Sequence, residues 1–137
     1  MKQRIKRKIY LTIISLFFVN LSYAQTDNPC GAPALSVNAT CTFQGGTNAG
    51  ATTTAGVPAP GCANYLGGDV WYTVTVPASG NITIDMNTGV MTDAGMAIYS
   101  GACGALTLVE CDDDDSANGL MSMIALTGQT PGATLWV

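Results

Sequence analysis

The chain is built largely from short runs in which apolar and polar residues alternate, each closed by turn-forming residues. In the clearest run, Val70–Val76, three valines and Tyr72 alternate with Trp71 and two threonines. Successive side chains of a strand point to opposite faces, so such a run predicts a strand. Further runs cover Asn81–Met86, Gly95–Ser100, Leu106–Cys111, Met121–Leu126 and Ala133–Val137. Their spacing predicts an all-β fold without helices, an antiparallel β-sandwich of jelly-roll or immunoglobulin-like type.

The turn residues between two of these runs predict how their strands pair. Pro77–Gly80 separates Val70–Val76 from Asn81–Met86, and a hairpin is the simplest connection between neighbouring strands. Earlier in the chain the alternation is weaker. Leu35–Phe43 is expected to form a first strand or a short hairpin, and Ala49–Thr54 a strand within a loop.

The first 24 residues have the three parts of an export signal. Five basic residues lie among the first eight, an apolar run covers Ile9–Leu21, and Ser22 and Ala24 are the small residues of a cleavage site. The apolar run is too short to cross a bilayer, which takes about 20 residues. We therefore expect cleavage between Ala24 and Gln25, secretion to the extracellular side, and one domain over residues 25–137 without a membrane span.

Removal of this leader would leave a chain without any cationic side chain. All five lysines and arginines lie in the leader, histidine is absent, and all nine aspartates and glutamates follow it. The net charge of residues 25–137 is therefore about −9. Nucleic acids and anionic lipid surfaces attract lysine and arginine, so neither is an expected partner. Cations are the expected partners.

The same composition argues against catalysis in residues 25–137. Histidine is the usual acid–base catalyst near neutral pH, and serine or cysteine nucleophiles need a neighbouring base such as histidine or lysine. Phosphoryl transfer needs lysine or arginine to stabilise the transition state. A carboxylate pair of the glycosidase type is the remaining route, but most of the acids are bunched in one run. We expect the domain not to be an enzyme.

Cysteine usage indicates disulfides without fixing their pairing. Secretion makes disulfides the default, and the absence of histidine and of a Cys-x-x-Cys pair argues against zinc. A hairpin formed around Gly101–Ala105 would hold Cys103 and Cys111 about 16 Å apart, beyond the reach of a disulfide. The odd count leaves one cysteine as a free thiol or for an intermolecular bond. The five cysteines are Cys30, Cys41, Cys62, Cys103 and Cys111.

The run Asp112–Asp115 is the most distinctive chemical feature of the sequence. Four adjacent carboxylates repel one another unless water or a cation stabilises them, so the run is either a solvated loop or a Ca²⁺ site. Ca²⁺ is bound by six to eight oxygen ligands. Pairing of Gly95–Ser100 with Leu106–Cys111, with Ser100 opposite Leu106, would bring Asp93 opposite Asp113. The predicted metal ligands are Asp93, Asp112 and Asp114, with Asp85 as a further candidate.

Trp71 is the aromatic residue with the most open interpretation. Its side chain is expected on the face of the Val70–Val76 strand opposite the valines. There it would either pack in the core or under a loop, or form an exposed platform on which a sugar or peptide could stack.

Four longer runs resemble a known type of extracellular module: NPCGAPALSV, NAGATTTAGVPAPGCANYLGGDVWYTVTVPASG, MAIYSGACGALTLVECDDDDS and ALTGQTPGATLWV. They resemble a module of large secreted Bacteroidota proteins, similar to pre-peptidase C-terminal-like and CUB-like domains, and cover nearly all residues after the leader. The resemblance implies a β-sandwich attached to peptidases, glycosidases or adhesins that are exported by type IX secretion.

The function expected from these features is that of a non-catalytic accessory or adhesive module, stabilised by Ca²⁺, in a larger surface protein. One alternative is a module that binds a glycan or a protein at the cell surface. Another is the N-terminal part of a secreted hydrolase. Because Thr134–Val137 is an apolar strand without a closing turn, we expect the sandwich to be incomplete and further domains to follow Val137.

Overall fold

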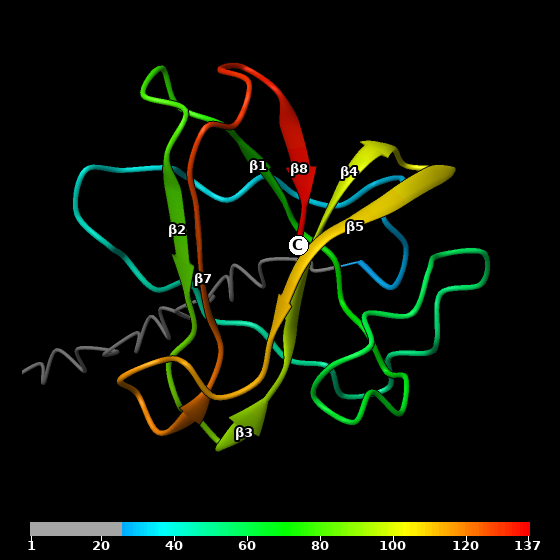
Figure 1. Cartoon of the computed structure of the whole chain (residues 1–137). Coiled ribbons are helices and arrows are strands. Elements are labelled where there is room, and N and C mark those ends of the chain that lie inside the picture. Colours follow the sequence, from blue (N-terminus) through cyan, green and yellow to red (C-terminus); the bar gives the residue numbers. More distant parts are fainter. Residues whose placement is uncertain (1–25) are drawn as a thin grey trace, which may run out of the picture.

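The computed structural model describes residues 26–137, so the predicted leader and its cleavage site lie outside the described residues. This part of the chain contains eight strands and no helix, and hence no helix that could cross a membrane (Figure 1). The strands are β1 (Thr73–Thr75), β2 (Ile82–Asp85), β3 (Asp93–Ala94), β4 (Met96–Ala102), β5 (Ala105–Asp112), β6 (Leu120–Met121), β7 (Met123–Leu126) and β8 (Thr134–Trp136).

The strands form the two layers of a β-sandwich, as predicted. One layer is an antiparallel sheet in the order β1-β8-β4-β5, and the other is the antiparallel pair β2-β7. A short parallel pair, β3-β6, lies beside them and is the one exception to the predicted antiparallel pairing. In Figure 1, β2 and β7 run together on one side of the molecule, apart from the larger sheet. The final run of the sequence, β8, lies inside the larger sheet, between β1 and β4.

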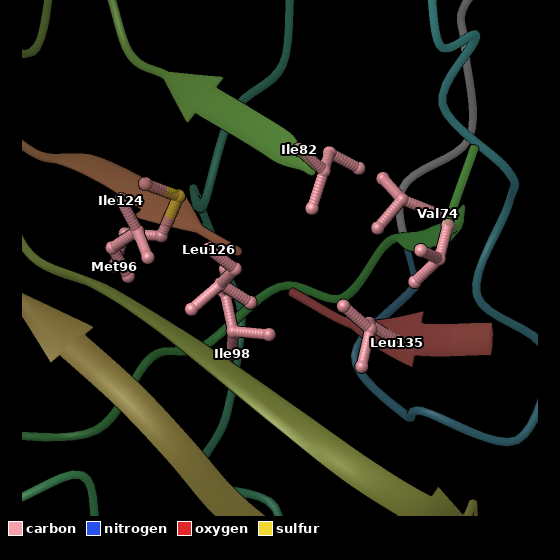
Figure 2. Close-up of a cluster of buried hydrophobic side chains, with 8 residues drawn as sticks. Val74, Ile82, Met96, Ile98, Ile124, Leu126 and Leu135 are labelled. Atoms are coloured by element: carbon pink, nitrogen blue, oxygen red, sulfur yellow. The ribbon is translucent and has the colours of Figure 1, made fainter. Parts of the chain in front are cut away.

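A single apolar core fills the space between the two layers. Ile98 of β4 is fully buried at its centre, with 0% of its surface exposed. Figure 2 shows that side chains from both layers point toward one another in this core. Burial of these groups is the main favourable contribution to folding. The core residues are Val74, Val76, Ile82, Met96, Ile98, Ile124, Leu126 and Leu135.

The opposite face of the larger sheet is also buried, beneath irregular segments of the chain. Trp71, Tyr99 and Leu106 form a second apolar cluster there, and Ala32 and Val57 pack against it. The Tyr99 hydroxyl donates a hydrogen bond of 2.8 Å to the carbonyl of Pro58, which fastens the covering segment. Both faces of this sheet are therefore packed.

The predicted hairpin between Val70–Val76 and Asn81–Met86 is wrong. The Pro77–Gly80 turn does form, with a hydrogen bond of 2.9 Å from the Gly80 amide to the Pro77 carbonyl. It leads the chain from one layer to the other, because β1 pairs with β8 and β2 pairs with β7. Val74 and Ile82 then contact the same core from its two sides (Figure 2).

The two weaker strand predictions are also wrong. Neither Leu35–Phe43 nor Ala49–Thr54 contains a strand. The first of them contributes a single backbone hydrogen bond of 2.8 Å, from the Leu35 amide to the Thr73 carbonyl. Residues 36–50 are exposed throughout, because their apolar side chains are too few and too scattered to cover a sheet.

The hairpin of β4 and β5 is confirmed, but its register differs from the prediction. Ser100 lies opposite Thr107, one residue away from the predicted partner. A β-bulge next to Ile98 then leaves Val109 without a partner and shifts the register by one more residue. The predicted alignment of Asp93 with Asp113 therefore does not occur within a strand pair.

Two disulfides join the irregular segments to this hairpin. Cys30 is bonded to Cys103 in the turn, and Cys62 is bonded to Cys111 near the end of β5. The expectation that Cys103 and Cys111 do not bridge each other is confirmed. Cys41 is the free cysteine and lies exposed in the irregular segment after residue 35.

Truncation of the most deeply buried core residue is expected to destabilise the domain strongly. The Ile98→Ala variant should lose about 2–5 kcal/mol of unfolding free energy, because it removes buried methylene groups and leaves a cavity. Thr83→Ala, on the exposed side of β2, is the control and should change stability by less than about 0.5 kcal/mol. Urea denaturation without reducing agent measures both; equal losses would contradict this description of the core.

Candidate functional site

Three carboxylates converge where β3 begins and β5 ends. Asp93 is the first residue of β3, and Asp113 and Asp114 directly follow β5. One carboxylate oxygen from each of them lies within 4.8 Å of the other two. We call these residues the aspartate triad. Three carboxylate oxygens at this spacing could bind one hard cation such as Ca²⁺, which takes oxygen ligands.

Two of the predicted ligands, Asp93 and Asp114, belong to the aspartate triad, and the third, Asp112, does not. The structure brings Asp93 and Asp114 together, but Asp113 takes the place predicted for Asp112. Asp112 is the last residue of β5, where it is the partner of Met96, because the register of the hairpin differs from the predicted one at both the turn and the bulge.

The Asp112 carboxylate instead organises the backbone around it. Its Oδ2 accepts hydrogen bonds from the amides of Met123, at 2.9 Å, and Asp115, at 3.1 Å. Partial burial would raise the pKa of Asp112, but these backbone N–H groups outweigh it and hold the pKa below its ordinary value. Asp112 thus connects β5 to β7 and to the loop that follows β5.

Asp85, the further candidate, is also outside the triad. Its Oδ1 accepts a hydrogen bond of 2.7 Å from the Ser116 hydroxyl, and its Oδ2 accepts one of 3.3 Å from the Asn118 side chain. These contacts fasten the loop between β5 and β6 to the end of β2, so Asp85 has a structural role.

Backbone carbonyl oxygens of residues next to or within the triad surround the side chain of Ser122. The Ser122 hydroxyl oxygen lies 2.8 Å from the carbonyl of Ala94 and 2.9 Å from the carbonyls of Asp112 and Asp113. A hydroxyl has one proton and can donate it to only one of these three acceptors. Ser122 is fully buried, with 0% of its surface exposed. Ser122 therefore holds together the segments that carry Asp93 and Asp113.

The electrostatics of the triad favour a bound cation. Desolvation and the negative charges of Asp113 and Asp93 raise the pKa of Asp114. No lysine, arginine or histidine exists in residues 26–137 to offset these charges. A cation placed between the three carboxylates would remove the repulsion.

Of the two positions expected for Trp71, the exposed platform is wrong and packing under a loop is confirmed. Only 4% of its surface is exposed, and its ring contacts that of Tyr99 at a centroid distance of 5.4 Å. The indole Nε1 donates to the Asp69 carboxylate at 2.7 Å and approaches the Thr54 hydroxyl at 2.8 Å. Trp71 therefore packs under the irregular segment 51–69, which was the alternative expectation.

Asp69 is a central residue of this segment that the sequence analysis missed. Its carboxylate accepts hydrogen bonds from Trp71, from the Thr54 hydroxyl and amide, and from the Tyr65 hydroxyl at 2.5 Å. Burial would raise the pKa of Asp69, but these donors outweigh it and lower the pKa. Burial and the hydrogen bond to Asp69 raise the pKa of Tyr65 to about 12. A lone acid two residues before the tryptophan of the clearest strand was the available signal.

A shallow cavity lies at the other end of the β4–β5 hairpin. Its volume is about 200 Å³, and no charged side chain lines it. The Cys30–Cys103 disulfide, Thr54 and Leu106 contribute to its lining. The eight residues of β5 separate this cavity from the aspartate triad, which corresponds to about 25 Å at 3.3 Å per residue.

The hydrogen bonds of Asp69 predict an acid-sensitive contribution to stability. Because folding lowers the Asp69 pKa, this contribution is present above the unfolded-state pKa of about 3.9 and is lost as pH falls through the folded-state value. The gap in unfolding free energy between the wild type and Asp69→Asn should therefore narrow when pH falls below about 4. Urea denaturation between about pH 3 and 7 measures it, with near-ultraviolet circular dichroism confirming the fold. A gap that stays constant over this range would contradict the role of Asp69.

Comparison with known protein families identifies this domain. Residues 27–127 match a family described as galactose binding domain-like and associated with type IX secretion. No curated protein and no solved structure matched the chain. A link to a secretion system, together with two disulfides, places the protein outside the cytoplasm, as a secreted or cell-surface protein. Since the match spans most of the sequence, the chain belongs to the galactose-binding-domain-like family associated with type IX secretion.

Proposed function

We propose that this domain is a non-catalytic binding module of a larger extracellular protein, and that Ca²⁺ bound by the aspartate triad stabilises its loops. The observation that carries the proposal is the convergence of Asp93, Asp113 and Asp114, whose carboxylate oxygens lie within 4.8 Å of one another. Nothing cationic in residues 26–137 offsets their charge. The family to which the chain belongs supports a binding role.

The chemistry of the available ligands favours Ca²⁺ over other metals. Zinc prefers nitrogen and sulfur ligands, whereas the triad offers carboxylate oxygens only. Mg²⁺ requires a strict octahedral shell and keeps most of its waters, while Ca²⁺ accepts carboxylate, carbonyl and hydroxyl oxygens in flexible numbers. The triad is exposed, so water would complete the shell around the three carboxylates.

The bonding of the carboxylates supports a non-catalytic role. A glycosidase needs one carboxylic acid whose pKa is raised inside a pocket, so that it can protonate the leaving group. Asp69 and Asp112 have lowered pKa values and are engaged by hydrogen bonds. Asp114, whose pKa is raised, is exposed to solvent. This distribution suits structural and metal-binding carboxylates.

Ca²⁺ is expected to bind to the wild type and to raise its melting temperature. At a Ca²⁺ concentration of 100 times the Kd, binding to the folded state alone adds about 2.7 kcal/mol of stability. Removing one ligand charge in Asp93→Asn or Asp114→Asn should weaken binding by at least about tenfold. Isothermal titration calorimetry and thermal unfolding measure these effects after treatment of the protein with a chelator.

The matched control is Asp115→Asn, which removes a charge from the same acidic run but outside the triad. It should retain nearly the full thermal shift. Absence of both heat and thermal shift in the wild type at millimolar Ca²⁺ would refute the metal site. If Asp115→Asn and Asp114→Asn lost equal amounts of the thermal shift, the stabilisation by Ca²⁺ would be general charge screening and not binding at the triad.

A carbohydrate is the second ligand that we propose, because the family is described as galactose-binding-like. The buried position of Trp71 means that a sugar would not stack on this ring. We expect retention of the domain on immobilised galactose or a related sugar, and competition by the free sugar. Retention that is unchanged by free sugar would count against a specific carbohydrate site.

A further inference from the structure

The two edges of the larger sheet differ in how their backbone groups are satisfied. The N-terminal segment covers the β1 edge. The Trp71 amide donates to the Thr26 carbonyl at 2.9 Å, and the Thr73 amide donates to the Pro33 carbonyl at 2.9 Å. β5 forms the opposite edge, and its sole neighbour in the sheet is β4 (Figure 1).

The β5 edge is long and open. β5 has eight residues and is the longest strand in the described part of the chain. Within residues 26–137, no backbone group from Ala105 to Cys111 forms a hydrogen bond outside the pairing with β4. The two-residue turn places Ala102 opposite Ala105 as a hydrogen-bonded pair. Since such pairs alternate, the amides and carbonyls of Leu106 and Leu108 point outward.

The edges of the smaller sheet are more restricted. The Met123 amide on the outer side of β7 is occupied by the Asp112 carboxylate. At the end of β2, the Met86 carbonyl accepts hydrogen bonds from Ser116 and Asn118. Open sheet edges invite pairing with another strand, and many proteins guard them with lysine or proline. β5 contains neither, and the bulge at Val109 interrupts only its second half.

The charges around β5 indicate the chemistry of a strand that would pair with it. Glu110 is exposed on β5, and the acidic run continues beyond the end of the strand. The domain has no cationic side chain and a net charge of about −9, so a second copy would be repelled. A partner strand added antiparallel to β5 would have its N-terminal end beside Glu110.

We propose that the β5 edge is a docking site for an extended segment of a partner protein that carries lysine or arginine at its N-terminal end. Backbone hydrogen bonds to Leu106 and Leu108 hold the segment, and contact of its basic residues with Glu110 sets its direction. This mode of binding is independent of the aspartate triad, so it does not require Ca²⁺.

The test uses a labelled, end-blocked peptide of sequence Lys-Lys-Thr-Val-Thr-Val-Thr-Val and the secreted domain. Fluorescence anisotropy should show saturable binding in the presence of either Ca²⁺ or a chelator. Hydrogen exchange should become slower at the amides of Leu106 and Leu108. A peptide of the same composition with both lysines at the C-terminal end should bind more weakly, because its charges would lie far from Glu110.

Two comparisons test whether the peptide binds at the β5 edge or is attracted only by the net charge of the domain. Thr107→Lys places a cation on the exposed side of β5 and should weaken binding by about fivefold or more. Thr75→Lys makes the same change at an exposed position of β1, whose edge is covered, and should leave affinity unchanged. Glu110→Gln should weaken binding of the lysine peptide but not of a peptide with threonine in place of both lysines.

Several outcomes would overturn the proposal. Absence of binding would do so, as would binding without protection of Leu106 and Leu108, or protection of β2 instead. If Thr75→Lys and Thr107→Lys weakened peptide binding equally, the interaction would depend on net charge and not on the β5 edge. Self-association in sedimentation experiments, with protection of β5 in the absence of peptide, would identify a second copy as the occupant.

Discussion

Because there is no cationic side chain after residue 8, the carboxylates of this domain have only neutral N–H and O–H groups of the domain as possible hydrogen-bond donors. Four of them are satisfied in this way, and each fastens an irregular segment to a strand or to another segment. Three others, Asp93, Asp113 and Asp114, receive no such hydrogen bond among the described residues and face one another. The mutual repulsion of these three carboxylates favours the binding of a cation from solution. The four satisfied carboxylates are those of Asp27, Asp69, Asp85 and Asp112.

The segment 51–69 shows how a long stretch without secondary structure can be held in place. Asp27 accepts hydrogen bonds from the Thr52 amide and hydroxyl, both at 2.6 Å, and the Cys62–Cys111 disulfide fixes the segment further along. Gly95 allows close contact at this point, because a Cβ atom there would lie 2.2 Å from the Cβ of Ala63. These attachments cover the second apolar cluster without any strand pairing, and so complete the burial of the larger sheet.

The sequence was sufficient to predict the all-β class, the β4–β5 hairpin and the separation of Cys103 from Cys111. Alternation shows which side chains share a face, but it carries no information on the partner of a strand. Val74 and Ile82 therefore appeared as neighbours in one hairpin, although they meet across the core. Two residues of the triad, Asp93 and Asp114, were among the predicted ligands. The register of the β4–β5 hairpin, with its shift at the turn and its bulge at Val109, cannot be recognised from local pattern. The roles of Asp69 and Trp71 depend on contacts between distant segments, such as the bond from Trp71 to Thr54.

The enclosure of Trp71 gives the domain its own optical reporter. An indole ring in an apolar, water-free environment emits at shorter wavelengths than one in water, and its emission responds to nearby charged groups. The ring lies under the segment 51–69 and shares a hydrogen bond with Asp69, whereas the other tryptophan, Trp136, is half-buried and donates to the Pro29 carbonyl at 3.1 Å. A displacement of the covering segment that left the sandwich intact would expose Trp71 to water. Unlabelled protein can therefore reveal that motion by its intrinsic fluorescence alone.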